Sequence, residues 1–214
     1  TATVVTNEDT SVALELNAPT VTDASDQTGL APGDNPERLG LITLTGIPNG
    51  AQLLYGAASF SANGGAVTIL LSDAGNLIAS PGAATLTMTR AQFEALRVVP
   101  PANSGTNFTV TMSVTSFEVN DTGAPLATVP GAVSSIGVLV DVRAVTDAID
   151  LKINGSDAPY NATINEDTAL NLTPLLTAAF QDLDGSEHRD IVIGNPPGNG
   201  TIYVNGTAVT AGTS

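Results

Sequence analysis

Residues 108–115 read Phe-Thr-Val-Thr-Met-Ser-Val-Thr, a strict alternation of large apolar and hydroxyl-bearing side chains. Successive side chains of a β-strand point to opposite faces, so this stretch predicts a strand with one buried and one solvated face. Further along the chain, Ile136, Val138, Val140 and Val142 repeat the two-residue period. They predict a long final strand.

Shorter apolar runs before residue 108 predict further strands, which Gly, Asn and Pro turns separate. These runs are Leu39–Thr45, Gln52–Tyr55, Val67–Leu71 and Leu86–Met88. Asn63-Gly64-Gly65 is interpreted as a hairpin turn. About seven or eight short strands at a spacing of roughly ten residues are typical of a β-sandwich with Greek-key connections, so the predicted fold class is all-β.

One short segment departs from the β pattern. Thr89-Arg90-Ala91-Gln92 matches a capping box, in which the first and fourth residues satisfy the free backbone donors at the start of a helix. We therefore expect one helical turn, with Phe93 and Leu96 pointing into the core. Aromatic residues make up only 4% of the chain, so aliphatic side chains must fill most of that core.

An internal repeat predicts tandem modules. Asn7-Glu8-Asp9-Thr10 recurs 158 positions later as Asn165-Glu166-Asp167-Thr168. Two further pairs of landmarks recur in the same order at a spacing of 150, which places an eight-residue insertion around Ser25–Gly33 of the first copy. These pairs are Asp34–Glu37 with Asp184–Glu187, and Asn49–Leu53 with Asn199–Tyr203.

The repeat divides the chain into a complete β-sandwich module over residues 1–146 and a linker plus the first part of a second module over residues 147–214. Each Asn-Glu-Asp-Thr copy is expected to lead into an alternating strand, with Val12, Leu14 and Leu16 in the first and Leu170 and Leu172 in the second. In the linker, acidic residues alternate with Ile149, Leu151 and Ile153. This pattern favours an ordered segment over a flexible tether and suggests a further strand.

The charge balance excludes several classes of partner. The chain has 21 acidic and 6 basic residues, a net charge of −15, yet only 13% of its residues are charged and 42% are hydrophobic. Such a chain folds, and it repels nucleic acid and anionic membranes while attracting cations. It has no cysteine and no apolar run near the roughly 18 residues that a membrane helix needs. We interpret it as a piece of a longer bacterial exported protein.

The order of these landmarks resembles the tandem extender repeats of giant bacterial adhesins exported by type I secretion, the RTX-adhesin group, and other Ig-like or cadherin-like repeats. The matching stretches are Thr163–Thr168, Phe180–Glu187, Gly46–Ala51 and Val138–Asp147. The resemblance implies an extracellular, non-enzymatic β-sandwich that projects a distal ligand-binding region from the cell surface. It also implies neighbouring repeats of the same polypeptide as partners, and Ca²⁺ that makes the module junctions rigid.

Acidic residues at the predicted junction are candidate calcium ligands, because Ca²⁺ takes six to eight oxygen ligands and segments that converge there can supply several carboxylates. The candidates are Glu8, Asp9, Asp147, Asp150, Asp157, Glu166 and Asp167, with a second group in the acidic loop of Asp182, Asp184 and Glu187. In the first copy, Pro32 replaces one acid of that loop, and Asp23 or Asp26 would have to substitute for it. The alternative is a solvated acidic surface in which Asn and Asp form turns.

Enzymatic motifs are missing from the sequence. His188 is the only histidine, so neither a multi-histidine zinc site nor a conventional buried triad is expected. Two alternatives to a structural extender stay open. In the first, the chain is a ligand-binding module that grips a glycan or peptide with the insertion around Ser25–Gly33 and the Ala57–Gly65 loop. In the second, the chain is a segment of an extracellular filament, and strands from a neighbouring chain complete its second module.

Overall fold

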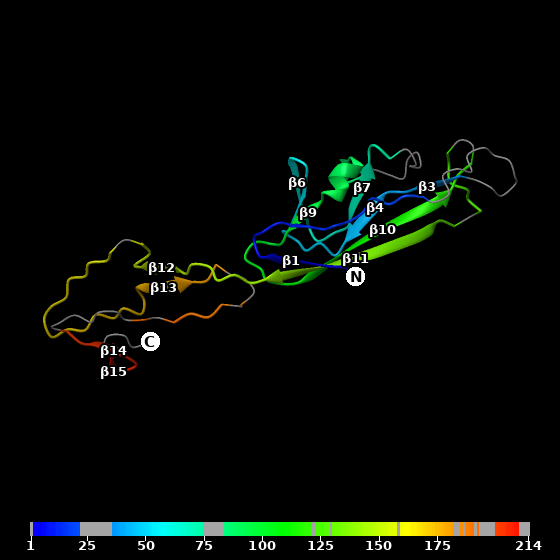
Figure 1. Ribbon diagram of the computed structural model, residues 1–214. Helices are drawn as coiled ribbons and strands as arrows, with labels where there is room; N and C mark the ends of the chain where they lie inside the picture. The colour runs from blue at the N-terminus through cyan, green and yellow to red at the C-terminus, as the bar shows by residue number, and fades with distance from the viewer. Residues whose placement is uncertain are drawn as a thin grey trace. The chain divides into compact units, whose positions relative to one another are not determined.

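The protein is described by a computed structural model that covers residues 2–21, 36–74, 84–120, 123–128, 130–157, 159–181, 185, 187–190, 192 and 200–209. The chain divides into two compact units, unit 1 (Thr1–Ile149) and unit 2 (Asp150–Ser214). The described residues form β-strands and one short helix (Figure 1), so the predicted all-β class is confirmed.

Unit 1 contains two sheets. The larger one has the order β1-β11-β10-β4-β7-β8, with β3 also paired to β10, and the smaller one has the order β2-β9-β5-β6. The strands of the larger sheet are β1 (Ala2–Asn7), β3 (Glu37–Leu39), β4 (Ile42–Thr45), β7 (Val67–Leu71), β8 (Leu86–Met88), β10 (Phe108–Glu118) and β11 (Ala132–Arg143). Those of the smaller sheet are β2 (Val12–Ala13), β5 (Gln52–Tyr55), β6 (Ala58–Ser61) and β9 (Arg97–Val99).

The two alternating stretches form the long antiparallel pair β10 and β11. In β10, Val110, Met112 and Val114 are buried, as their period predicts. In β11, Val138, Val140 and Val142 are buried, and Ile136 is 50% exposed. The predicted long final strand is confirmed, and the part of it that contributes to the core begins at Val138.

One hydrophobic cluster receives side chains from both sheets of unit 1. The helix α1 (Arg90–Glu94) begins at Thr89, whose side chain accepts a hydrogen bond from the Gln92 backbone, and the Gln92 side chain bonds back to Thr89. The capping box is thus confirmed. Phe93 and Leu96 are fully buried, as expected from their positions after it.

Three local predictions are wrong. The run Leu39–Thr45 is split into β3 and β4. Leu39 pairs with Ser116 of β10, and Thr43 pairs with Ser113, so four steps along this run correspond to only three along β10. One extra residue therefore interrupts the pairing, as at a β-bulge. The strand expected after Thr10 stops at Ala13. Glu15 has a φ of 53°, which ends an extended strand, although Leu14 and Leu16 are buried.

The third wrong prediction is the hairpin turn at Asn63-Gly64-Gly65. This segment leads from β6 to β7, which belong to different sheets. The tight turn lies at Gly56 and Ala57 instead, between the paired residues Tyr55 and Ala58 of β5 and β6. Composition alone identified a turn but could not show which strands it connects.

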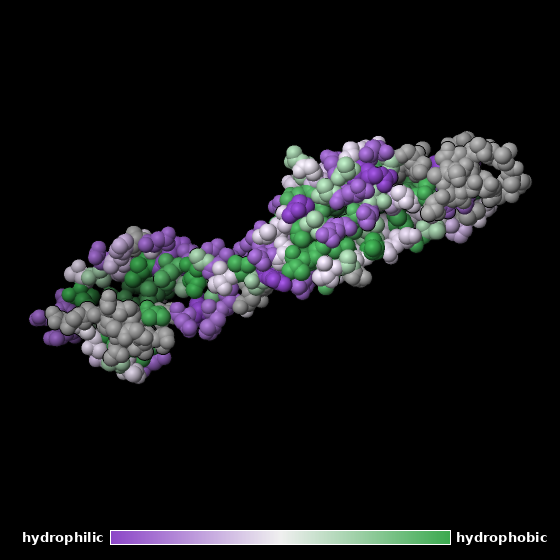
Figure 2. Space-filling model, viewed as in Figure 1, coloured by the Kyte–Doolittle hydropathy of each residue, from purple (hydrophilic) through white to green (hydrophobic). Residues whose placement is uncertain are grey.

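Unit 2 has two small sheets. β12 (Asp150–Ile153) pairs with β13 (Leu176–Ala179), which confirms the further strand suggested for the linker, and β14 (Ile202–Val204) pairs with β15 (Thr207–Val209). The strand predicted around Leu170 and Leu172 is absent from the described residues. Figure 2 shows apolar residues at the surface of this unit, and none of its described side chains is buried.

The β5–β6 hairpin of unit 1 recurs in unit 2 as the β14–β15 hairpin, at nearly the spacing of the sequence repeat. Ile202 lies 150 positions after Gln52, the first residue of β5, and each strand leads through a tight turn into a second strand.

Among the described residues, no helix is long and apolar enough to cross a membrane.

We expect Phe93→Ala to destabilise unit 1 by about 3–5 kcal/mol, because it removes the largest fully buried side chain and leaves a cavity. Val133→Ala, at a residue that is 69% exposed, should cost less than about 0.5 kcal/mol. Urea unfolding followed by circular dichroism measures both. Equal losses for the two variants would contradict the placement of Phe93 in the core.

Candidate functional site

The repeated Asn-Glu-Asp-Thr motif forms the same turn in both units. Asp9 and Asp167 have φ values of 56° and 60°, in the left-handed region that aspartate tolerates better than most residues. In each copy the threonine N–H donates to the asparagine carbonyl at 3.3 Å, from Thr10 to Asn7 and from Thr168 to Asn165. The motif therefore has the same local geometry at both places in the chain.

In unit 1 this turn lies beside the segment through which the chain leaves the unit. β1 pairs in parallel with β11, from Ala2 opposite Val138 to Asn7 opposite Arg143. Directly after this ladder, the Glu8 N–H donates to the Arg143 carbonyl at 3.0 Å. The Glu8 side chain is only 4% exposed, and its Oε1 accepts a hydrogen bond from the backbone N–H of Val145. The first turn of the unit is thus bonded to its exit segment.

Two residues of the loop before β10 hold the same exit segment. Asn107 Oδ1 accepts a hydrogen bond from the Val142 N–H at 2.6 Å. A Cβ atom at Gly105 would lie 3.0 Å from the Cβ of Ala144, so this close approach suits glycine. We call Glu8, Gly105 and Asn107 the exit clamp. Sequence reasoning missed Gly105 and Asn107, because residues 103–107 look like any polar turn.

The other acidic candidates of unit 1 lie close to the exit clamp. Asp9 Oδ1 accepts a hydrogen bond from the Asn103 N–H at 3.0 Å, which holds the same loop on its other side. Asp147 follows two residues after Val145 and is partly buried. The structure therefore brings Glu8 and Asp9 to the end of unit 1 at which residues 143–147 leave it.

In unit 2, Asp150 is engaged by the only lysine of the chain. Lys152 Nζ lies 2.6 Å from Asp150 Oδ2, and the side chains are 36% and 44% exposed. The hydrogen bond and the charge of Asp150 raise the pKa of Lys152 above its ordinary value, and the charge of Asp157 adds to this. Glu166 and Asp167 are exposed and Glu187 is partly buried, whereas Asp182 and Asp184 lie outside the described residues.

The described residues do not assemble a calcium site by themselves. Within them, no three Asp, Glu or His side chains lie close enough to hold one metal ion. Several candidate carboxylates bond to the protein instead: Glu8 to the Val145 backbone, Asp9 to the Asn103 backbone and Asp150 to Lys152. Since calcium takes six to eight oxygen ligands, a site on this chain needs oxygens beyond these.

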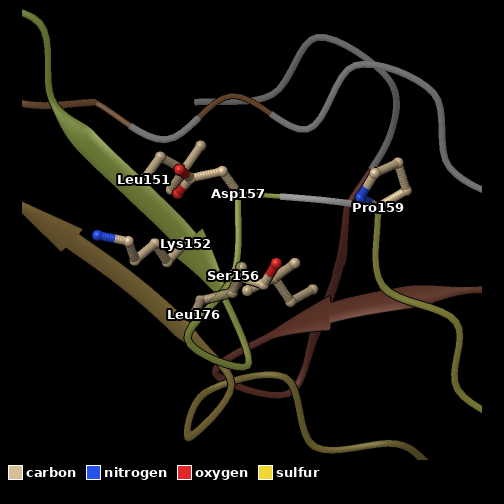
Figure 3. Close-up of a pocket in the computed structure, with 7 residues that line it drawn as sticks. Leu151, Lys152, Ser156, Asp157, Pro159 and Leu176 are labelled. Carbon is tan, nitrogen blue, oxygen red and sulfur yellow. The ribbon is translucent and has the colours of Figure 1, made fainter.

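An open groove of about 350 Å³ lies on unit 2 (Figure 3). It is mostly apolar, and the side chains of Leu151 and Leu176 in it are 59% and 40% exposed. Its lining residues are Leu151, Lys152, Ile153, Ser156, Asp157, Pro159 and Leu176. The groove exposes no catalytic grouping. It presents an apolar surface beside one ion pair.

Two further features of the sequence are the single histidine and the loop suggested for ligand binding. His188 Nε2 lies 3.6 Å from Asp190 Oδ1, and the imidazole is 89% exposed. The proposed ligand-binding loop Ala57–Gly65 contains strand β6, which corrects its description as a loop. Ser25–Gly33, with Asp26, lies outside the described residues, as does Asp23.

Comparisons with known protein families, with curated proteins and with solved structures found no significant match to this chain.

We expect Glu8→Ala to lower the free energy of unfolding of unit 1 by about 1–3 kcal/mol, because it removes the buried carboxylate that accepts the part-buried hydrogen bond from the Val145 N–H. Glu8→Gln is the matched control, since its side-chain carbonyl can accept the same hydrogen bond. Urea unfolding of the two variants measures the difference. Indistinguishable stabilities of the alanine variant and the original protein would remove Glu8 from the exit clamp.

Proposed function

We propose that this chain is a non-enzymatic structural segment of a large bacterial cell-surface adhesin, which carries tension along a tandem array of modules. The single observation that carries the proposal is the parallel pairing of β1 with β11, the first and last strands of unit 1. Because the strands are parallel, the chain enters the pair at Ala2 and leaves it beyond Arg143, at the opposite end of the ladder (Figure 1).

This arrangement suits a load-bearing role. Tension applied through the two ends of unit 1 pulls β1 and β11 in opposite directions along their common axis. The six register pairs from Ala2–Val138 to Asn7–Arg143 are then loaded together instead of one after another. A ladder loaded in this shear geometry resists more force than one that opens pair by pair from an end.

The exit clamp adds resistance at the end where β11 leaves. Hydrogen bonds from Val142 and Val145 to the side chains of Asn107 and Glu8 tie the last residues of β11 and those that follow it to the body of the unit. Each such bond contributes about 0.5–1.5 kcal/mol net, with more expected for the charged acceptor. The load path therefore continues beyond the ladder.

The finer fold within this proposal is an Ig-like or cadherin-like β-sandwich with Greek-key connections, repeated in tandem. In its favour, the two sheets of unit 1 share one core, and the Asn-Glu-Asp-Thr turn and the β5–β6 hairpin both recur in unit 2. The resemblance to adhesin extender repeats supplies the location, outside the cell, and the partners, which are neighbouring repeats of the same polypeptide.

Calcium dependence is the second part of the proposal. The carboxylates proposed to bind Ca²⁺ in this array are those of Asp147, Asp157, Glu166 and Asp167, with the loop of Asp182, Asp184 and Glu187. A chain with a net charge of −15 gains from bound cations, because they reduce the repulsion between its carboxylates.

The mechanical role predicts which core substitutions weaken unit 1 under load. Val4 of β1 is 6% exposed and lies in the sheared pair, whereas the fully buried Leu53 lies in β5 of the other sheet. Single-molecule force spectroscopy, in which the whole chain is pulled by its ends, tests this. We expect Val4→Ala to lower the unfolding force more than Leu53→Ala does. At equilibrium the order is reversed, because the leucine loses more buried carbon. The same order under force as at equilibrium would contradict the shear geometry.

For calcium, we expect the thermal unfolding temperature of the chain to rise by several degrees in millimolar Ca²⁺ relative to chelator, since a ligand bound to the folded state stabilises it. Mg²⁺ at the same concentration is the control for screening by a divalent cation. Asp147→Asn with Asp167→Asn should reduce the calcium effect. Equal unfolding temperatures in Ca²⁺, Mg²⁺ and chelator would leave the acidic residues as a solvated surface and would leave the mechanical role intact.

A further inference from the structure

Two turns of unit 2 consist of the same pair of residues, an asparagine followed by a glycine. Asn154-Gly155 directly follows β12, and Asn205-Gly206 joins β14 to β15. The φ values are 51° and 74° in the first turn and 51° and 79° in the second, so all four residues lie in the left-handed region. Left-handed φ values at both central residues are typical of a type I′ turn, for which Asn-Gly is a preferred sequence.

An Asn-Gly sequence carries the reactants for its own modification. The backbone nitrogen of the glycine attacks the side-chain carbonyl carbon of the asparagine, and the side-chain nitrogen leaves as ammonia with the proton of the backbone nitrogen. Water then opens the cyclic succinimide at either of its carbonyl carbons and yields aspartate or isoaspartate. Glycine favours the attack because it has no Cβ to hinder it. The neutral amide becomes a carboxylate, so a chain of net charge −15 becomes more negative with each event.

The attacking nitrogen is accessible in both turns of unit 2. Both asparagines and both glycines are exposed. Among the described residues, no heavy atom lies within 4 Å of a Cβ atom added at Gly155 or Gly206, and neither glycine N–H donates a hydrogen bond. The described structure therefore leaves room for the succinimide and holds neither nitrogen back.

The two Asn-Gly sequences of unit 1 are held by hydrogen bonds instead. At Asn49-Gly50, the glycine N–H donates to the Ala62 carbonyl at 3.0 Å. At Asn63-Gly64, the asparagine Oδ1 accepts a hydrogen bond from the Gly65 N–H at 3.1 Å, which fixes the side chain that the attack requires. These bonds must break before either sequence reacts. Asn199 of the remaining Asn-Gly sequence lies outside the described residues.

We propose that Asn154 and Asn205 are sites of spontaneous deamidation in the folded protein, whereas Asn49 and Asn63 are protected. All four residues precede a glycine, so the difference between them comes from the hydrogen bonds of the fold and not from the sequence. The inference concerns the chemistry of the chain itself and does not depend on the proposed function.

The two products of the reaction have different effects on the turns. Aspartate tolerates the left-handed region as asparagine does, and Asp-Gly also suits a type I′ turn, so this product retains the strand pairing. Isoaspartate adds a carbon atom to the backbone of the turn and changes the loop that fixes the register of a hairpin. At residue 154 it also disturbs the backbone N–H that donates to the Leu175 carbonyl at 2.7 Å, beside β13.

Timed peptide mapping by mass spectrometry of the 214-residue chain tests the proposal. The chain is incubated at mildly alkaline pH, once folded and once in denaturant, and is then digested with trypsin. The tryptic peptides that carry the four asparagines are 39–90, with Asn49 and Asn63, 153–189, with Asn154, and 190–214, with Asn205. In denaturant the four sites should react at similar rates. In the folded chain we expect Asn154 and Asn205 to react at least about fivefold faster than Asn49 and Asn63, which must first break a hydrogen bond.

Substitution by glycine provides matched variants, because Gly-Gly also suits a type I′ turn. The double variant N154G/N205G should accumulate fewer acidic charge variants with time than the original protein, as measured by ion-exchange chromatography of the folded chain. Asn49→Gly is the control, since it removes an asparagine from a protected site and should leave this accumulation unchanged.

Two results would overturn the proposal. The first is a set of equal rates at the four sites in the folded chain, or faster reaction at Asn49 or Asn63 than at Asn154 and Asn205. The second is equal accumulation of acidic variants in N154G/N205G and in the original protein.

Discussion

The parallel ladder between β1 and β11 is the constraint on which the rest of unit 1 depends. The antiparallel hairpins β5–β6 and β14–β15 are closed by tight turns, whereas the parallel pair β1–β11 joins the first and last strands of unit 1 and depends on residues that are far apart in the sequence. The ladder brings Asn7 beside Arg143 and therefore places the first turn against the exit segment. The burial of Glu8, the hydrogen bond to Val145 and the opposite positions of entry and exit all follow from this one pairing.

The two units differ in the burial of their described residues, and the same pairing accounts for the difference. Unit 1 buries aliphatic side chains of both sheets around Phe93, and β11 contributes Val138, Val140 and Val142 to that core. In unit 2, the segment that corresponds to β1 has no paired strand among the described residues, and none of the described side chains is buried. Local turns and hairpins therefore form in both units, whereas a core is present only where the long non-local pairs exist.

The sequence predicted features that depend on neighbouring residues and missed those that depend on distant ones. β5, β7 and β8 have the predicted limits, and the capping box at Thr89 places Phe93 as expected. Periodicity cannot show a left-handed residue such as Glu15, nor that β3 and β4 are offset by one residue against β10. The exit clamp was missed for the same reason, since Asn107 acquires its role only when Val142 is beside it.

Glu8 and Glu166 show how far the motif can identify a site. Both occupy the same position of the same turn, yet Glu8 is 4% exposed and Glu166 is exposed. The difference lies in the segment beside them, because the residues that follow β11 place the Val145 backbone N–H where it donates a hydrogen bond to the Glu8 carboxylate. Counting carboxylates treats both residues as equivalent, whereas the structure holds the Glu8 carboxylate against the backbone of the exit segment. A strand that pairs with residues 160–165 as β11 pairs with β1 would place Glu166 in the same environment, so the surroundings of this glutamate depend on a non-local pairing that the motif does not encode.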